Sequence, residues 1–436
     1  MRKTLWVAIS VGVGGAAFAE TSPTFSKDVA PILYKNCASC HRPGDIAPMP
    51  LLTYEQARPW AKSIREKVSL GQMPPWHAAQ PAGTFSNDRR LTEADKDILV
   101  RWAAAGAPQG NPKDLPPAPK FTEGWEIGTP DAVFSIPKAY DVSASGTIAY
   151  QYFTVPTNFT EDKWVQAIEV RPGNRAVVHH VLVFSREQRT PGRTPAYTAV
   201  LPKPIALAPN ANNSAAHSDP PAPQKDPDIL IATTAPGTNA MIFEPGSAMR
   251  VKAGSTLVFQ IHYTANGKPA TDQSSVGMIF AKDAPAREVR NGAFTNVFLK
   301  LPAGASDQSV DSVIQFNQNI HITALFPHTH VRGKSWEYRL VYPNGNSEIV
   351  LSVPKYDFNW QTYYVYSKPL AVPKGALLEA RARYDNSDAN PSNPDPKIDV
   401  HWGEQTWQEM QYSGITYYVD DAPGAPAAPS SSAEQK

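Results

Sequence analysis

The sequence predicts a multidomain protein in which a small all-α domain is followed by two all-β sandwich domains. Before residue 106, apolar residues recur with the period of about 3.6 residues that is typical of amphipathic helices. After residue 133, they alternate with polar residues in short runs bounded by Gly, Pro or Asn, which is the pattern of half-buried strands. The chain of 436 residues contains 43 prolines, which suits short strands and long connections better than a helical bundle.

The N-terminus has the features of a signal peptide over residues 1–19. A charged start precedes an apolar stretch, and Ala17-Phe18-Ala19 has the small-residue pattern of a cleavage site. We therefore expect an exported protein that is periplasmic or secreted. The apolar stretch is short for a membrane span and no later stretch approaches the required length, so we expect no membrane span after cleavage.

Charge and cysteine content exclude two further classes of protein. The chain has 41 Lys and Arg against 40 Asp and Glu. It therefore has no excess of positive charge that would indicate a nucleic-acid partner. It has only two cysteines, three positions apart, so a disulfide scaffold is excluded even for an exported protein. The folded state must then be held together by hydrophobic cores.

The predicted α domain, residues 20–106, contains three helical patterns. Thr53 and Gln56 have the spacing of a capping box at the start of the second helix. Thr92 is placed to cap the third, and Gly106 is placed to end it. Four apolar residues with helical spacing define the first pattern: Phe25, Val29, Ile32 and Leu33.

A C-x-x-C-H motif, Cys37 to His41, lies between the first two helical patterns. It is the attachment signature of a covalent haem c, in which Cys37 and Cys40 bond the haem vinyl groups and His41 binds the iron. A redox dithiol would require a βαβ setting, and a zinc site would require further Cys or His nearby. We therefore expect one covalent haem in a cytochrome c domain.

The sixth haem ligand has three candidates in the α domain. Met73 lies between predicted helices and is followed by two prolines, which resembles the small class I cytochromes c, where the axial Met commonly precedes Pro. We favour Met73 as the second axial ligand. Met49 and His77 remain the alternatives, because either could instead reach the iron.

A proline-rich linker, residues 107–133, leads to the β region, in which six runs read as strands. We place one β domain at 134–285 and a second at 286–420. Residues 202–228 are expected to be a long surface insertion, and residues 421–436 a disordered tail. The six runs are "DKWVQAIEV", "RAVVHHVLVF", "STLVFQIHYT", "NIHITALF", "EYRLVYPNG" and "LLEARARYD".

Histidines gather on three of these strands. His328 and His330 are two residues apart, so their side chains share one face of an extended chain. His179 and His180 are consecutive and should face opposite sides, so both could reach one metal ion only at a bulge or a strand end. The remaining candidate ligands are His262 and the thioether of Met410.

Four motifs in one order, "VVHHVLVF", "QIHY", "PHTHVRG" and "TWQEMQYSGITYY", make residues 134–418 resemble the copper type II ascorbate-dependent monooxygenases. This is the family of peptidylglycine α-hydroxylating and dopamine β-monooxygenases. The resemblance implies two jelly-roll-like domains that hold two copper ions across an open cleft. It implies an electron-transfer copper bound by His179, His180 and His262, and an oxygen-binding copper bound by His328, His330 and Met410.

The ligand types agree with copper. Imidazoles suit copper, a thioether selects Cu(I), and zinc rarely uses Met. Three other histidines are rival ligands. We interpret His321 as a strand-face residue, His401 as a residue behind the ligands or in the core, and His217 as a solvent-exposed residue of the insertion.

Together these features predict an exported, haem c- and copper-dependent monooxygenase that hydroxylates a C–H bond of a small molecule with O2. The haem would receive electrons from an upstream donor and pass them through the three-histidine copper to the His-His-Met copper. The alternative is a copper-binding or electron-transfer protein that oxidises no substrate. The peptide-amidating members of the family bind a substrate carboxylate with two anchoring residues. This chain has Phe326 and Gly414 at the matching positions, so both anchors are missing. We therefore expect a less polar substrate that reaches the copper between Phe326 and Tyr412.

Overall fold

The computed structural model describes residues 22–43, 47–121, 124–187, 196–200, 229–235, 238 and 240–420. The predicted signal peptide, the insertion at 202–228 and the tail at 421–436 lie outside these described residues. The chain forms two compact units, a small helical unit and a large β unit. Each is described by itself.

The helical unit comprises residues up to Arg42, Met49–Met73 and Leu91–Pro119. The predicted caps are confirmed. The Thr53 side chain accepts a hydrogen bond from the Gln56 backbone N–H in a complete capping box, and the Thr92 side chain accepts one from the Asp95 backbone N–H. Its elements are η1 (Phe25–Val29), α1 (Ala30–Asn36), α2 (Tyr54–Ala57), η2 (Arg58–Trp60), α3 (Ala61–Ser69), α4 (Glu93–Ala104) and η3 (Pro112–Asp114).

Phe25, Leu33, Leu99 and Trp102 form the centre of this unit's core and are almost fully buried. The indole N–H of Trp102 donates to the Pro108 carbonyl at 3.0 Å. The start of the expected linker is therefore packed against the helices instead of running free. None of the helices in the described part of the chain has the length and apolarity needed to cross a bilayer.

Residues 74–90, which we expected within one continuous domain at 20–106, belong to the β unit. Phe85 is 2% exposed and forms a bridge with Tyr366. The Trp76 ring lies 5.9 Å from Phe85 and 5.2 Å from Tyr364, measured between ring centroids. Because these aromatic side chains bury more area in the β core than a short loop on the helices offers, the segment packs there.

The β unit is a sandwich of mostly antiparallel sheets, which confirms the β-rich part of the predicted fold class. All six predicted runs form strands. Its strands are β1 (Ala132–Ser135), β2 (Tyr140–Val142), β3 (Gln151–Pro156), β4 (Lys163–Arg171), β5 (Val178–Arg186), β6 (Tyr197–Val200), β7 (Ile229–Thr234), β8 (Met241–Ile242), β9 (Ser247–Val251), β10 (Thr256–Tyr263), β11 (Ala270–Asp272), β12 (Ser275–Phe280), β13 (Arg287–Thr295), β14 (Lys300–Leu301), β15 (Gln308–Phe316), β16 (Ile320–His328), β17 (Gly333–Val341), β18 (Ser347–Val353), β19 (Tyr364–Val372), β20 (Leu377–Tyr384), β21 (Val400–His401) and β22 (Tyr412–Val419).

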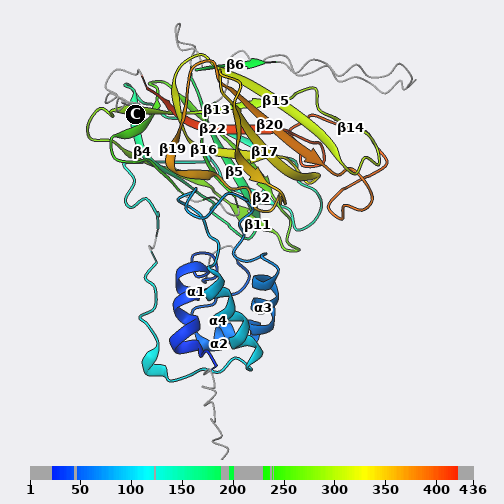
Figure 1. Ribbon diagram of the computed structural model, residues 1–436. Helices are drawn as coiled ribbons and strands as arrows, with labels where there is room; N and C mark the ends of the chain where they lie inside the picture. Colours follow the sequence, from blue (N-terminus) through cyan, green and yellow to red (C-terminus); the bar gives the residue numbers. More distant parts are fainter. Residues whose placement is uncertain are drawn as a thin grey trace, which may run out of the picture. The chain divides into compact units, whose positions relative to one another are not determined.

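One sheet runs through both halves of the β unit. Its strand order is β1-β12-β4-β9-β13-β22-β16-β19, with β8 paired to β4. The strand just after the expected boundary at 285, β13, pairs antiparallel with β22, beside which it is labelled in Figure 1, and in parallel with β9 on its other side. β6 from the first half also extends the sheet β18-β17-β20-β15 of the second half. The two halves are thus joined by backbone hydrogen bonds.

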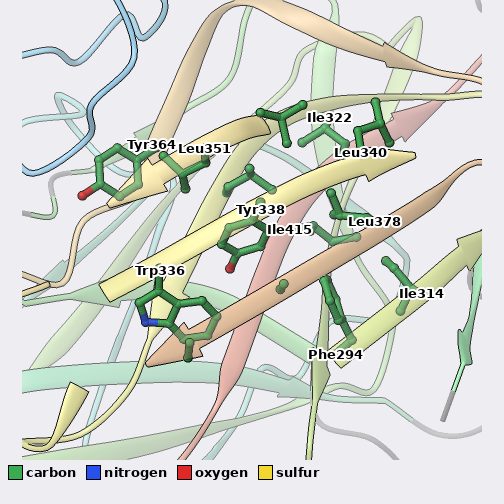
Figure 2. Close-up of a cluster of buried hydrophobic side chains, with 14 of the residues drawn as sticks. Phe294, Ile314, Ile322, Trp336, Tyr338, Leu340, Leu351, Tyr364, Leu378 and Ile415 are labelled. Carbon is green, nitrogen blue, oxygen red and sulfur yellow. The ribbon is translucent and has the colours of Figure 1, made fainter. Parts of the chain in front are cut away.

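The largest core lies between the second-half sheets. Alternate residues of β17, Trp336, Tyr338 and Leu340, point into it and are at most 2% exposed. Figure 2 shows them facing Ile322 of β16 and Ile415 of β22, which come from the nine-stranded sheet. Burying a side chain of this size stabilises the fold by roughly 2 kcal/mol, so this core provides a firm base for the loops that carry the candidate ligands.

Candidate metal centres

His179, His180 and His262 meet at the ends of β5 and β10. The two strands are antiparallel, with His262 opposite His180, but Tyr263 lies opposite Val178. His179 is therefore the extra residue of a β-bulge, which is the condition for adjacent histidines to face one point. One nitrogen from each of the three imidazoles lies within 4.8 Å of the others.

The three rings form a compact, largely buried group. Their centroids are 5.1 to 5.5 Å apart, and the Nδ1 atoms of His179 and His180 are 3.2 Å apart. Nδ1 of His262 is buried and has no hydrogen-bond partner among the described residues. Burial, followed by the proximity of His179, lowers the pKa of His262 to about 3. Neutral imidazoles with an unused nitrogen fit a soft or borderline metal such as copper.

Tyr150 connects this cluster with the second half of the β unit. Its ring centroid lies 5.3 Å from that of His180 and 5.0 Å from that of His262. Its hydroxyl is hydrogen-bonded to the Thr406 hydroxyl at 3.0 Å, and its backbone N–H donates to the Gln405 side chain at 3.1 Å. These bonds hold the chain that leads to Met410 against the first cluster.

His328 and His330 form a second cluster at the end of β16. Their ring centroids are 5.3 Å apart, and the side chains are 8% and 1% exposed. His328 pairs with Tyr412 of β22, which is the last pair of this ladder. Met410 lies two residues before Tyr412 in the sequence, so the predicted thioether ligand belongs to the segment that enters β22 beside His328. Burial lowers the pKa of both imidazoles, that of His328 to about 4.

Glu409 fastens the two chain segments of this second cluster together. It is fully buried, and its carboxylate accepts hydrogen bonds from the backbone N–H groups of His330 (2.8 Å), Arg332 (2.8 Å) and Met410 (3.0 Å). Burial raises its pKa to about 7, against the opposing effect of these donors. The side chain acts through the backbone of the candidate ligands.

An aromatic cluster occupies the positions of the missing carboxylate anchors. Phe326 is 2% exposed, and its ring stacks on Tyr363 at 4.4 Å between centroids. It lies opposite Gly414, where a Cβ atom would come within 3.0 Å of the Phe326 Cβ, so only glycine leaves room for the ring. Phe326 also contacts Tyr412 edge-to-face. The two residues between which we expect the substrate to pass are therefore in ring contact.

The family resemblance implies an open cleft between the two metal centres, whereas in the structure a side chain lies between the two histidine clusters. The ring of Phe358 stacks on His179 and lies within 6.4 Å of both His328 and His330, measured between centroids. A phenyl ring thus occupies the space between the two clusters. It comes from the loop that joins β18 and β19.

The C-x-x-C-H motif follows the end of α1. The backbone N–H groups of Cys40 and His41 both donate to the Cys37 carbonyl, which closes a turn. Burial, with a smaller effect of Cys40, raises the pKa of Cys37 to about 12, which does not suit a reactive dithiol. Nδ1 of His41 is 3.1 Å from the Met49 carbonyl oxygen. When Nδ1 donates this bond, Nε2 is left with a lone pair for a metal.

The candidate sixth ligands fall in different units. Met73 is the last residue of its segment of the helical unit, and Met49 packs against the helical core. His77 belongs to the β unit, where its Nδ1 lies 2.6 Å from the Lys355 carbonyl oxygen. This bond leaves Nε2 of His77 buried and without a hydrogen-bond partner among the described residues, so His77 stays a candidate beside the two methionines.

The rival copper ligands lie elsewhere on the β unit. His321 is paired with Asp420 at 2.6 Å and stacks on Tyr418. His401 is an exposed residue of β21, so the expectation that it lies behind the ligands or in the core is wrong. His217 falls outside the described residues. Neither His321 nor His401 therefore joins the two histidine clusters.

The family comparison supports copper chemistry in the second half of the β unit. Residues 305–432 match the family described as copper type II ascorbate-dependent monooxygenase, C-terminal domain. This segment contains His328, His330 and Met410. The match indicates a copper-dependent oxidoreductase that uses oxygen. No curated protein matches this chain.

The comparison with solved structures adds little information about this chain. The chain is similar to the major capsid protein P2 from bacteriophage PM2, with 9% identity over 66% of this chain and 97% of that protein, and a TM-score of 0.25. Allantoicase gives 8% identity over 57% of this chain and 81% of that protein, with a TM-score of 0.17. Likenesses this weak carry no argument about function.

Three residues of the site were missed in the sequence. Glu409 could have been found, because it directly precedes the candidate ligand Met410 and a carboxylate beside a buried metal site requires buried donors. Tyr150 and Phe358 lie far from every ligand in the sequence and carry no metal-binding group. Only the pairing of distant strands brings them to the site.

Proposed function

We propose that this protein is an exported copper-dependent monooxygenase that hydroxylates a C–H bond with O2 and draws its electrons from its own covalent haem c. His179, His180 and His262 would hold the copper that receives each electron. His328, His330 and Met410 would hold the copper at which oxygen is used. The family match across the second cluster is the observation that carries the proposal, and the three-histidine cluster supports it.

Bound copper would supply the one-electron chemistry that activates dioxygen. The chain's own contribution is to keep the ligands neutral, oriented and dry. Burial lowers the pKa of all five candidate imidazoles, so each is uncharged at neutral pH and offers a lone pair. A thioether at Met410 would favour the reduced ion that reacts with oxygen.

Cys37, Cys40 and His41 would hold the haem, with Met73 as the preferred second axial ligand and Met49 or His77 as the alternatives. The hydrogen bond from His41 Nδ1 to the Met49 carbonyl would fix the ring and make Nε2 a better donor to iron. An intramolecular haem would raise the effective concentration of the electron donor at the copper ions. Its own reductant would be an upstream redox protein or a small molecule.

The aromatic cluster supports a substrate without a carboxylate. Phe326, Tyr363 and Tyr412 offer no cationic group, so a charged carboxylate placed there would lose its hydration without gaining an ion pair. A glycine-extended peptide should therefore not be turned over. Steady oxidation of such a peptide at the glycine Cα would contradict this substrate class while leaving the metal ligands in place.

Oxygen consumption tests the enzyme directly. Copper-loaded protein with reduced haem should consume O2 and form a hydroxylated product when one of a panel of apolar C–H substrates is present. The Met410→Leu variant, which keeps the side-chain volume, is the matched control and should form none. Rapid haem oxidation without product across the panel would favour an electron-transfer protein instead.

A further inference from the structure

The loop of residues 354–363, which joins β18 to β19 and is here called the bridging loop, contacts both histidine clusters. The Phe358 ring stacks on His179 with centroids 5.3 Å apart and planes at 13°. The same ring lies 6.4 Å from His328 and 6.2 Å from His330. One apolar side chain therefore separates imidazoles that belong to two candidate metal centres.

Two polar side chains of the bridging loop also lie beside one imidazole of each cluster. Asn359 raises the pKa of His179 and Gln361 raises that of His328, in each case against the larger lowering by burial. Second partners of this kind fix the orientation of a ligating imidazole, and their loss commonly weakens metal affinity about 10- to 100-fold. Both partners come from a single loop, so the orientation of one cluster is tied to that of the other.

The bridging loop is braced internally. The Asp357 carboxylate accepts hydrogen bonds from the backbone N–H (2.9 Å) and side-chain amide (3.0 Å) of Asn359. The Gln361 amide donates to the Phe358 carbonyl at 3.2 Å. These bonds leave little freedom for Phe358 to swing away from the imidazoles.

Tyr356 anchors the start of the loop on the second cluster. Its hydroxyl donates to the Thr329 carbonyl at 2.9 Å and accepts from the Thr329 N–H at 3.2 Å. Thr329 stands between His328 and His330 in the sequence and is fully buried. The loop is thus attached to the backbone that presents both candidate ligands.

We propose that the bridging loop couples the two metal centres, with Phe358 as the spacer that keeps water out from between them and with Asn359 and Gln361 as positioning residues. This inference rests on the proposed function. With copper bound at both clusters, one electron would pass from the three-histidine centre to the His-His-Met centre, and the haem would replace it at the first. No proton or bond change occurs on the loop, whose contribution is a dry and fixed path.

Water access to Cu(II) tests the role of Phe358. Copper content is measured first, and two ions per chain are expected in the unsubstituted protein and in every Phe358 variant. In D2O, electron spin echo modulation from deuterium near the copper should rise about twofold or more in Phe358→Ala, because the deleted ring leaves room for water. Phe358→Leu keeps an apolar side chain and should stay near the unsubstituted value. Phe298→Ala, at an exposed aromatic residue, is the surface control.

The outcomes separate the two hypotheses. Failure of the unsubstituted protein to bind copper at either cluster would overturn the proposed function, and the coupling with it. Two bound copper ions with equal deuterium modulation in Phe358→Ala and the unsubstituted protein would keep the proposed function and overturn the spacer. Equal gains in the Ala and Leu variants would also overturn it, because an apolar filler should suffice.

The positioning roles are tested one centre at a time. With His330→Ala, copper is observed at the three-histidine cluster alone, and Asn359→Ala should shift its Cu(II) hyperfine coupling while Gln361→Ala leaves it unchanged. With His262→Ala, copper is observed at the second cluster alone. There, Gln361→Ala should shift the Cu(II) hyperfine coupling and Asn359→Ala should leave it unchanged. Shifts that do not follow this pairing, or no shift with either variant, would overturn the assignment. Circular dichroism of each variant checks that it is folded.

Discussion

Glu409 gives the sharpest quantitative prediction for the second metal centre. Its carboxylate accepts three backbone N–H groups from the segments that carry His330 and Met410, and it is fully buried. Glu409→Ala would leave three buried donors without an acceptor, at about 1–3 kcal/mol each. The expected loss is roughly 3–9 kcal/mol, comparable with the whole stability of a typical domain of about 5–15 kcal/mol.

The stability of the Glu409→Gln variant should lie between those of the unsubstituted protein and the Glu409→Ala variant. The retained carbonyl can still accept from His330 and Met410, but the new NH2 group faces the Arg332 N–H. The cost should then be about 1–3 kcal/mol. Urea unfolding at pH 7.5, followed by copper analysis, should give the order unsubstituted, Gln, Ala for both stability and copper content. Asp388→Asn, at an exposed carboxylate of the β unit, should cost only about 0.5 kcal/mol.

Two results would refute this reasoning. If Glu409→Ala unfolds at the same urea concentration as the unsubstituted protein, the three hydrogen bonds carry no net stability. If the variant is folded but loses copper from the three-histidine cluster and retains it at His328 and His330, Glu409 does not organise the second centre.

Three further predictions concern the cofactors and pH. Met410→Leu should abolish Cu(I) binding at the second centre while copper remains at the first. Copper analysis and X-ray absorption measure this, and equal loss of copper at both centres would mean that they are not independent. Cys37→Ser combined with Cys40→Ala should leave no haem on the denatured chain in a gel stained for haem, and haem that still migrates with it would contradict the attachment. The folded-state pKa is about 3 for His262 and about 4 for His328, below the ordinary imidazole value of about 6.5, so the unfolded chain takes up protons first as pH falls. Metal-free protein should therefore lose roughly 3 kcal/mol per group between pH 6.5 and pH 4, and a flat urea midpoint over that range would contradict it.

The sequence was sufficient for what depends on local pattern. Alternation identified the six strands, and the capping chemistry of Thr53 and Thr92 identified two helix starts. The adjacent pair His179 and His180 could be predicted to need a bulge, because strand geometry forbids a shared face without one. These conclusions rest on residues that are neighbours along the chain.

The remainder depends on pairing between distant segments, for which a single sequence carries no signal. The parallel contact of β9 with β13 and the addition of β6 to β15 could not be read from alternation, since any strand of suitable polarity would satisfy it. The place of Phe85 in the β core was hidden for the same reason. An apolar residue predicts that it will be buried, but not against which unit.

The position of β22 in the nine-stranded sheet has a consequence for how the chain matures. This strand, Tyr412–Val419, is the last in the sequence and lies between β13 and β16. During synthesis, β13 and β16 emerge before β22. One edge of each stays unpaired until more than 80 further residues have followed β16, Ile320–His328. Such edges readily pair with other chains. A product truncated before Tyr412 would keep both edges open, so we expect it to aggregate, and chaperones that shield strands should matter most in this late interval.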